Sequence, residues 1–273
     1  MTSFFKLWRL EIDLDKSYCW AVDGDNRKAL AQFPLQRLEH AKELGGSLTF
    51  GARPRVCDIK DRMSRLDDRW PVLKRSAASL TQNLLALSTV FWPEGLHGIL
   101  SCRFAYSHLD VLRRKAALAL GWRKAGSSPA MRFLLSDTPF SDPLLWHHKT
   151  VLMDFRRLCR KSSDFFMHWA TFLAAYNGDL LAGPFSKMLE MTSHLGWSFL
   201  SADRILDHWQ VEWSLLKVPW HWCEHRLLDA WAWRVAQGFR SRKTAEDLHG
   251  IDLWAHRSFT RCLLYTSPSP RDA

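Results

Sequence analysis

The densest group of side chains that could do chemistry in this sequence is a basic run from Arg53 to Arg75. Lys and Arg bind phosphate oxygens, and each contact adds affinity that weakens as salt rises. Aspartates lie among them, so a solvated helix with paired charges of both signs is an equally good interpretation. The charged residues are Arg53, Arg55, Lys60, Arg62, Arg65, Arg69, Lys74 and Arg75, with Asp58, Asp61, Asp67 and Asp68.

Smaller basic clusters occur at residues 113–115, 123–124 and 156–161. Their spacing does not identify a ligand. The tryptophans of the C-terminal half could stack on nucleic-acid bases. Large aromatic side chains in a helical protein more often form its core, and we expect that role here. They include Trp209, Trp213, Trp220, Trp222, Trp231 and Trp233.

Residues 221–225, His-Trp-Cys-Glu-His, place three types of metal ligand within a short segment. A structural zinc site needs a second ligand group at a characteristic spacing, and the sequence offers none. We therefore predict the start of a helix with partly exposed histidines at this segment, and no metal site. The 6 cysteines are scattered singly, which predicts free thiols.

The common catalytic and nucleotide-binding motifs are missing from the sequence. It contains no GxxxxGK[ST] phosphate loop, GxGxxG, GxSxG or HExxH. Nothing in it therefore supports a free-standing hydrolase, kinase or dehydrogenase.

The composition predicts a globular protein with an anionic partner. Of the 273 residues, 47% are hydrophobic, and 38 Lys and Arg against 28 Asp and Glu give a net charge of +10. No segment approaches the roughly 20 apolar residues that a membrane helix needs, so we expect no membrane association. Glu11 and Asp13 interrupt what would be the apolar part of a secretory signal, which predicts an intracellular protein of otherwise unknown location.

The pattern of apolar residues predicts a small β part followed by helices. Apolar and polar residues alternate over 7–14 and resume at 18–22, which is typical of a hairpin. Residues 34–44 have helical spacing, and residues 47–50 read as a short strand. Further helices are predicted at 55–70, 72–91, 107–120, 143–158, 164–176, 184–195 and 223–236, with breaks at 92–95, 126–129, 177–178 and 183–184. The predicted class is mainly α, of the α+β type.

Two N-terminal segments together resemble reverse transcriptases. Leu14-Asp15-Lys16-Ser17 is similar to the lysine motif that follows the catalytic aspartates, and residues 43–50, ELGGSLTF, resemble the Leu-Gly hairpin that grips the primer. The segment 92–99, WPEGLHGI, resembles the LINE-like (non-LTR) retrotransposon enzymes in particular. Further similarities lie at His108–Arg113, Ala116–Leu120, Lys124–Gly126, Asp142-Pro143, Asp154–Arg156, Gly183-Pro184 and Leu195–Trp197, so the resemblance covers residues 1–261.

The resemblance implies the C-terminal part of an RNA-directed DNA polymerase with a right-hand fold. Residues 1–52 would be the end of the palm, 53–125 thumb-like helices and 126–261 a helical C-terminal region. Lys16 would protonate the leaving pyrophosphate as a general acid, although Asp13 stands where the family commonly has Asn. A solvated lysine in a hairpin turn is an equally good interpretation of Lys16 in this isolated chain. Leu44 and Gly45 would belong to the primer grip. The nucleic-acid contacts would come from Arg53, Arg55, Lys60, Arg62, Arg65 and Arg69.

The carboxylates needed for polymerisation are not in this sequence. Such enzymes use two Mg²⁺ ions held by aspartates, and the chain has no Tyr-x-Asp-Asp. We therefore expect no cofactor in this fragment, binding of an RNA–DNA template–primer, and no polymerisation. The alternative is a non-catalytic basic helical interaction protein. The sequence does not predict an oligomeric state.

The last twelve residues differ in composition from the rest of the chain. Residues 262–273, CLLYTSPSPRDA, resemble a translated sequencing-library adapter. We expect them not to be native, and they are left out of the interpretation of the fold.

Overall fold

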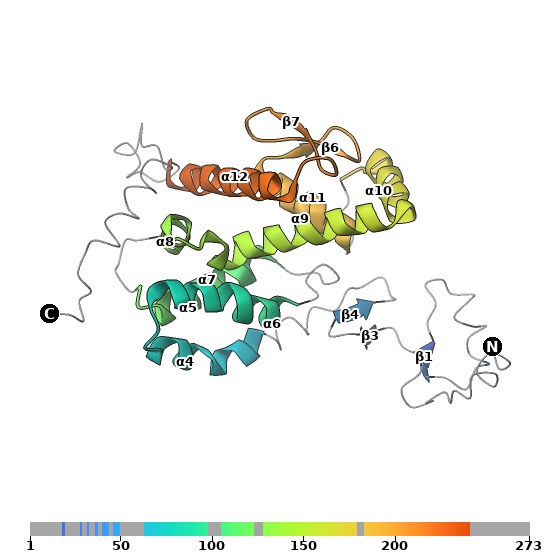
Figure 1. Ribbon diagram of the computed structural model, residues 1–273. Helices are drawn as coiled ribbons and strands as arrows, with labels where there is room; N and C mark the ends of the chain where they lie inside the picture. Colours follow the sequence, from blue (N-terminus) through green and yellow to red (C-terminus); the bar gives the residue numbers. More distant parts are fainter. Residues whose placement is uncertain are drawn as a thin grey trace.

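The computed structural model describes residues 63–97, 105–122, 128–178 and 183–240, with short pieces between residues 18 and 49. The helical body is shown in Figure 1. Its helices are α4 (Trp70–Arg75), α5 (Leu80–Ala86), α6 (Trp92–Leu96), α7 (Tyr106–Ala119), α8 (Pro129–Leu135), α9 (Pro143–Lys161), α10 (Ser163–Ala175), α11 (Pro184–Leu195) and α12 (Trp220–Arg240), with shorter turns η2 (Leu66–Asp68), η3 (Leu87–Phe91, a π-helix) and η5 (Pro139–Ser141).

The described strands are short and belong to three small sheets. β1 (Tyr18–Cys19) is parallel to β2 (Gln36–Arg37), and β3 (His40–Glu43) is antiparallel to β4 (Gly46–Thr49). In the helical body, β5 (Ser198–Phe199), β6 (Arg204–Leu206) and β7 (Glu212–Ser214) form an antiparallel sheet in that order. The mainly α class with a small β part is thus confirmed.

Near the N-terminus, one predicted strand is confirmed and one predicted helix is wrong. β4 coincides with the strand predicted at 47–50, but residues 36–37 and 40–43 of the predicted helix 34–44 form strands. The register pairs His40 with Thr49 and Glu43 with Gly46, so cross-strand hydrogen bonding overrides the helical spacing of the apolar residues. β1 confirms a strand within 18–22, and its described partner is β2; residues 7–17 lie outside the described part.

In the helical body, the long helices were predicted best. α7, α9, α10, α11 and α12 all match predicted helices. The continuous helix at 72–91 is wrong, because Ser79 and Gln82 form a capping box that starts a new helix. The break at 92–95 is also wrong: Pro93 lies in the first turn of α6, where a proline removes no helical hydrogen bond. Of the break predicted at 126–129, residues 126–127 lie outside the described part, Ser128 is not helical, and Pro129 is the first residue of α8.

Helix α9 is the centre of the fold. It contacts α7, α10, α11 and α12, and Figure 1 shows it crossing the body between α7 and α12. Leu145, Leu152 and Phe155 on its inward face are all fully buried. A helix that is apolar along one stripe packs its neighbours around that stripe.

The start of α9 is fixed by the buried carboxylate of Asp142. Its Oδ1 accepts hydrogen bonds from the backbone N–H groups of Leu144 (2.8 Å) and Leu145 (3.2 Å). The guanidinium of Arg113 on α7 donates to both carboxylate oxygens, through Nε at 2.7 Å and Nη2 at 3.0 Å. This bidentate pair joins α7 to the first turn of α9. Arg113 donates in addition to Asp110, at 2.6 Å.

A second buried arginine holds the loop that precedes α12. Arg156 on α9 donates to the carbonyl oxygens of Leu216 (3.3 Å) and Val218, and its Nη1 lies 3.4 Å from the Sγ of Cys223. Asp203 accepts from the Ser214 hydroxyl and the backbone N–H of Leu216. These bonds attach the small sheet to the helices, because the polar groups of the loop are satisfied inside the protein.

We expect Asp142→Asn to lower the free energy of unfolding by about 3 kcal/mol, because asparagine can cap a helix but leaves Arg113 without its buried counter-charge. Asp142→Ala removes the cap as well and should cost about 1 kcal/mol more. Urea denaturation at pH 7 measures both. The control Asp110→Asn, which removes a half-exposed partner of the same arginine, should cost under about 1 kcal/mol; equal losses for all three variants would contradict this account.

Candidate functional site

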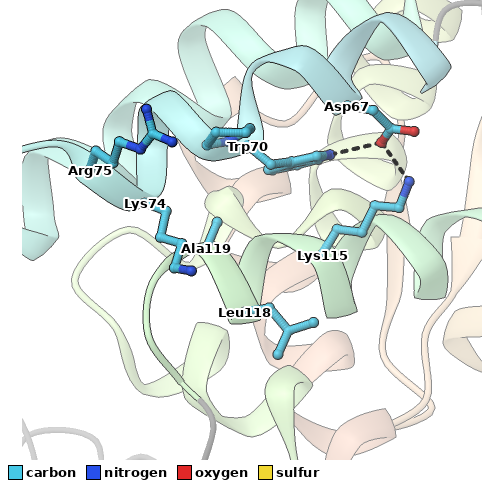
Figure 2. A pocket seen from close by; sticks show the side chains of 8 residues that line it. Asp67, Trp70, Lys74, Arg75, Lys115, Leu118 and Ala119 are labelled. Atoms are coloured by element: carbon cyan, nitrogen blue, oxygen red, sulfur yellow. Dashed lines mark hydrogen bonds and ion pairs between the residues drawn. The ribbon is translucent and has the colours of Figure 1, made fainter.

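An open groove of about 670 Å³ lies between α4 and α7. Figure 2 shows Asp67 and Lys115 at one end, Trp70 in the middle, and Lys74 and Arg75 at the other end. Pro71, Leu118 and Ala119 complete the lining. The groove therefore has apolar walls and three cationic side chains against one carboxylate.

The indole of Trp70 is held firmly in this groove. Its N–H donates to Oδ1 of Asp67 at 3.2 Å. Its ring packs on Phe91 and Trp92, with ring centroids 5.1 and 6.1 Å away. Neighbouring aromatic rings at such distances stabilise one another, so Trp70 serves mainly as a fixed wall of the groove.

The cations of the groove differ in how far their charge is compensated. The ammonium of Lys115 lies 2.5 Å from Oδ1 of Asp67, with side chains 39% and 49% exposed. An ion pair this exposed to water contributes little stability, so it orients Lys115 more than it stabilises the fold. Lys74 and Arg75 are exposed residues in the last turn of α4. The surface around α4 is consequently positive.

Two of the predicted nucleic-acid-binding residues lie in the described part of the chain. Arg65 is exposed just before η2, and Arg69 is exposed and hydrogen-bonded to Glu94 at 3.1 Å, which offsets its charge. Neither lines the groove. The other predicted site residues, Lys16, Leu44, Gly45, Arg53, Arg55, Lys60 and Arg62, lie outside the described residues; β3 and β4 flank positions 44 and 45.

Sequence reasoning missed that Lys115 joins Lys74 and Arg75. Lys115 is 48 residues from its partner Asp67 in the chain, so sequence spacing gave no sign of their meeting. The cluster at 113–115 was visible as a basic segment, but its members separate in the fold: Arg113 is buried, whereas Arg114 is exposed. Helical periodicity on α7 could have separated these residues. Leu109, Leu112 and Ala116 mark the inward face of the helix, and Arg113 lies next to them, so Arg113 could have been assigned to the buried side.

The tryptophans of the C-terminal half and the His-Trp-Cys-Glu-His segment contribute mainly to the hydrophobic core. Trp213 and Trp231 are buried, and the half-exposed Trp209 donates its indole N–H to Asp229 at 2.9 Å. Cys223 is fully buried, while His221 and His225 on either side are exposed. Across the described residues, no group of three potential metal ligands converges, and no helix there is long and apolar enough to cross a membrane.

A cluster of three histidines, two of them buried and one partly buried, lies where α7, α9 and α11 meet. His147 and His148 are fully buried, and Nε2 of His148 lies 3.1 Å from Nδ1 of His194. The ring of Tyr106 packs against all three, at centroid distances of 4.8 to 6.1 Å. No sequence pattern singled out this cluster, because its members come from three helices.

The environment of the cluster keeps its histidines neutral. Burial, with the nearby charge of Lys187, lowers the pKa of His147 to about 3. Burial, with Arg234 and Arg113, lowers the pKa of His194 to about 4. The pKa of His148 is well below 6.5, chiefly because of burial. Desolvation penalises the charged imidazolium, so the rings pack as neutral aromatic groups at pH 7.

Comparison of the chain with protein-family models, with curated proteins and with solved structures found no match in any of the three.

We expect the free energy of unfolding to fall as the pH decreases from 6.5 towards 4. In this window the unfolded histidines take up protons that the buried rings do not bind, so acid favours the unfolded chain. By pH 5 the loss should be about 1–2 kcal/mol for each buried histidine. Urea denaturation across this pH range measures it.

His194→Asn should reduce this pH dependence, because it removes one of the titrating groups. The matched control is His221→Asn, which replaces an exposed histidine on α12. A pH dependence that is the same in the wild type and His194→Asn would show that other groups cause the acid sensitivity.

Proposed function

We propose that this chain is part of a LINE-like (non-LTR) retrotransposon reverse transcriptase, and that its helical body binds the backbone of a nucleic acid at the groove between α4 and α7. The observation that carries the binding proposal is the gathering of Lys74, Arg75 and Lys115 from two distant segments along one open groove. The sequence resemblance over residues 1–261 supports the family.

The groove suits phosphate contact better than the reading of bases. Lys74 and Arg75 project from an exposed helix end, where they can neutralise phosphates without losing a buried partner. The indole of Trp70 is engaged by Asp67 and by two aromatic neighbours, so it is poorly placed to stack on a base. Binding through this groove should therefore depend on backbone charge and only weakly on sequence.

The wider proposal assigns roles to residues outside the described part. Lys16 would be the general acid for pyrophosphate release, and Leu44 and Gly45 would contact the primer end. In the parent enzyme, Mg²⁺ would be held by aspartates that this sequence does not contain, so the proposed activity of this chain is binding an RNA–DNA template–primer. Arg53, Arg55, Lys60 and Arg62 would add further contacts to the nucleic-acid backbone.

We expect the double variant Lys74→Gln with Arg75→Gln to bind a short labelled RNA–DNA hybrid about tenfold more weakly at moderate salt. The slope of log affinity against log salt concentration should become shallower by about 1–2 units, since two phosphate contacts are lost. Fluorescence anisotropy over a salt series measures both quantities.

The control is Arg160→Gln with Lys161→Gln, which removes the same charge from the exposed end of α9. That end leads into α10, away from α4 in Figure 1. The control should lose much less affinity than the groove variant. Equal losses for the two variants would mean that only net charge matters and that the groove is not the binding site.

A second candidate, a basic interaction protein that binds another protein, is favoured by exposed apolar side chains on α4 and α7. Leu118, which lines the groove, is 53% exposed, and Val72 on α4 is 70% exposed. Binding through such an apolar patch should be nearly insensitive to salt, whereas phosphate binding should weaken steeply. The salt series therefore separates the two functions.

The family itself can be tested in the genome from which the sequence came. If the proposal is right, the reading frame upstream of Met1 encodes Tyr-x-Asp-Asp within a few tens of codons. An upstream frame without such a motif would contradict the assignment to reverse transcriptases, while leaving the binding experiment unaffected.

A further inference from the structure

One carboxylate interrupts the positive charge of the groove between α4 and α7. Among the described residues that line the groove, Asp67 is the only acid, against three cations. Its side chain is 49% exposed, and the ion pair that it forms with Lys115 is open to water. Such a pair adds little to the stability of a fold. Asp67 therefore lowers the positive potential of the groove without contributing much to the packing of η2 against α7.

A single oxygen of Asp67 accepts from two donors of the groove. Oδ1 lies 2.5 Å from the ammonium of Lys115 and 3.2 Å from the indole Nε1 of Trp70, and Figure 2 shows both bonds meeting at this atom. The donors come from two helices, since Lys115 lies on α7 and Trp70 on α4. One anionic oxygen can thus satisfy both donors at once. A backbone phosphate presents oxygens of the same kind, so the carboxylate stands where a phosphate would fit.

The two donors do not depend on the carboxylate for their positions. The ring of Trp70 is held by Phe91 and Trp92, with centroids 5.1 and 6.1 Å away, so its N–H stays directed into the groove when the carboxylate leaves. Asp67 belongs to the short turn η2, and its half-exposed side chain can turn into water. Displacing the carboxylate therefore breaks one exposed ion pair and frees two donors that are already in place.

We propose that the carboxylate of Asp67 occupies a phosphate position of the groove, and that a nucleic acid displaces it on binding. A backbone phosphate then accepts from the ammonium of Lys115 and the indole N–H of Trp70, while Lys74 and Arg75 contact phosphates at the other end. This inference rests on the proposed function, to which it adds one phosphate position and an autoinhibitory carboxylate.

Displacement of the carboxylate favours polyanions over single anions. A free phosphate ion gains only the contacts with Lys115 and Trp70, and it must break the ion pair of Asp67 to make them. A nucleic acid reaches Lys74 and Arg75 in the same binding event, and these additional contacts offset the loss of the ion pair. Inorganic phosphate at constant ionic strength should therefore not displace a bound RNA–DNA hybrid.

The test compares Asp67→Asn with Asp68→Asn in the full chain. Asparagine retains an oxygen that can accept from Trp70 but removes the charge. The affinity for a labelled RNA–DNA hybrid at low salt, measured by fluorescence anisotropy, should rise about three- to fivefold in Asp67→Asn. Asp68 is exposed and does not line the groove, so the matched control Asp68→Asn should raise the affinity by less than about twofold.

The salt dependence gives a second measure of displacement. In the wild type the displaced carboxylate takes up a cation from solution, which offsets one of the cations released from the nucleic acid. The slope of log affinity against log salt concentration should therefore be steeper by about 1 unit in Asp67→Asn than in the wild type. A change in the packing of the groove alone would not alter this slope.

The variant Lys115→Gln separates displacement from a general effect of charge. In that background Asp67 has no ion pair with residue 115 to break, so Asp67→Asn should raise the affinity no more than Asp68→Asn does. Equal gains for Asp67→Asn and Asp68→Asn would overturn the inference. So would a gain that is the same with and without Lys115, or displacement of the hybrid by inorganic phosphate.

Failure of this inference can be distinguished from failure of the proposed function. If the wild type binds the hybrid and the double variant Lys74→Gln with Arg75→Gln weakens it, but Asp67→Asn does not strengthen it, the groove binds nucleic acid and only the role of Asp67 is wrong. If the wild type does not bind, or if the double variant binds as tightly as the wild type, both are wrong.

Discussion

The carboxylate of Asp142 is the point on which the arrangement of the body depends. It caps the first turn of α9 and accepts two hydrogen bonds from Arg113, so one buried group fixes both where the central helix begins and how α7 lies against it. α10, α11 and α12 pack on α9. Trp92 adds a nearby bond from α6, through its indole N–H to the carbonyl of Ser141 at 2.7 Å. An ionised group is tolerated there because each of its oxygens has a donor.

The basic residues of the body divide into two classes with different physical roles. Arg113 and Arg156 are buried, and their guanidinium groups satisfy carboxylate and carbonyl oxygens that would otherwise be unpaired. Lys74 and Arg75 remain in water, where their charges act over a distance of roughly 8–10 Å at ordinary salt. A net positive charge is therefore not by itself a measure of binding surface. Only exposed cations such as Lys74 and Arg75 can bind a polyanion without breaking a buried interaction that stabilises the fold.

The interior beside α7 is unusual because much of it is polar yet uncharged. The rings of His147, His148 and His194 pack against Tyr106 at steep angles, and burial keeps the imidazoles neutral. Such rings fill space as aromatic side chains do, but they make the fold sensitive to acid, since unfolding releases them to bind protons.

The sequence by itself determined the helical class and most of the long helices, because an apolar stripe at helical spacing needs only a neighbouring surface to form. It also located the basic segment to which Lys74 and Arg75 belong. Only the tertiary structure decided that residues 36–37 and 40–43 are strands, that the helix predicted at 72–91 divides at Ser79, and that Lys115 lies beside α4. It likewise decided which arginines are buried and which histidines meet. The division at Ser79 follows from a local capping box, which apolar periodicity does not detect. The position of Lys115, the buried arginines and the meeting of the histidines depend on partners far away in the chain, about which local periodicity carries no information.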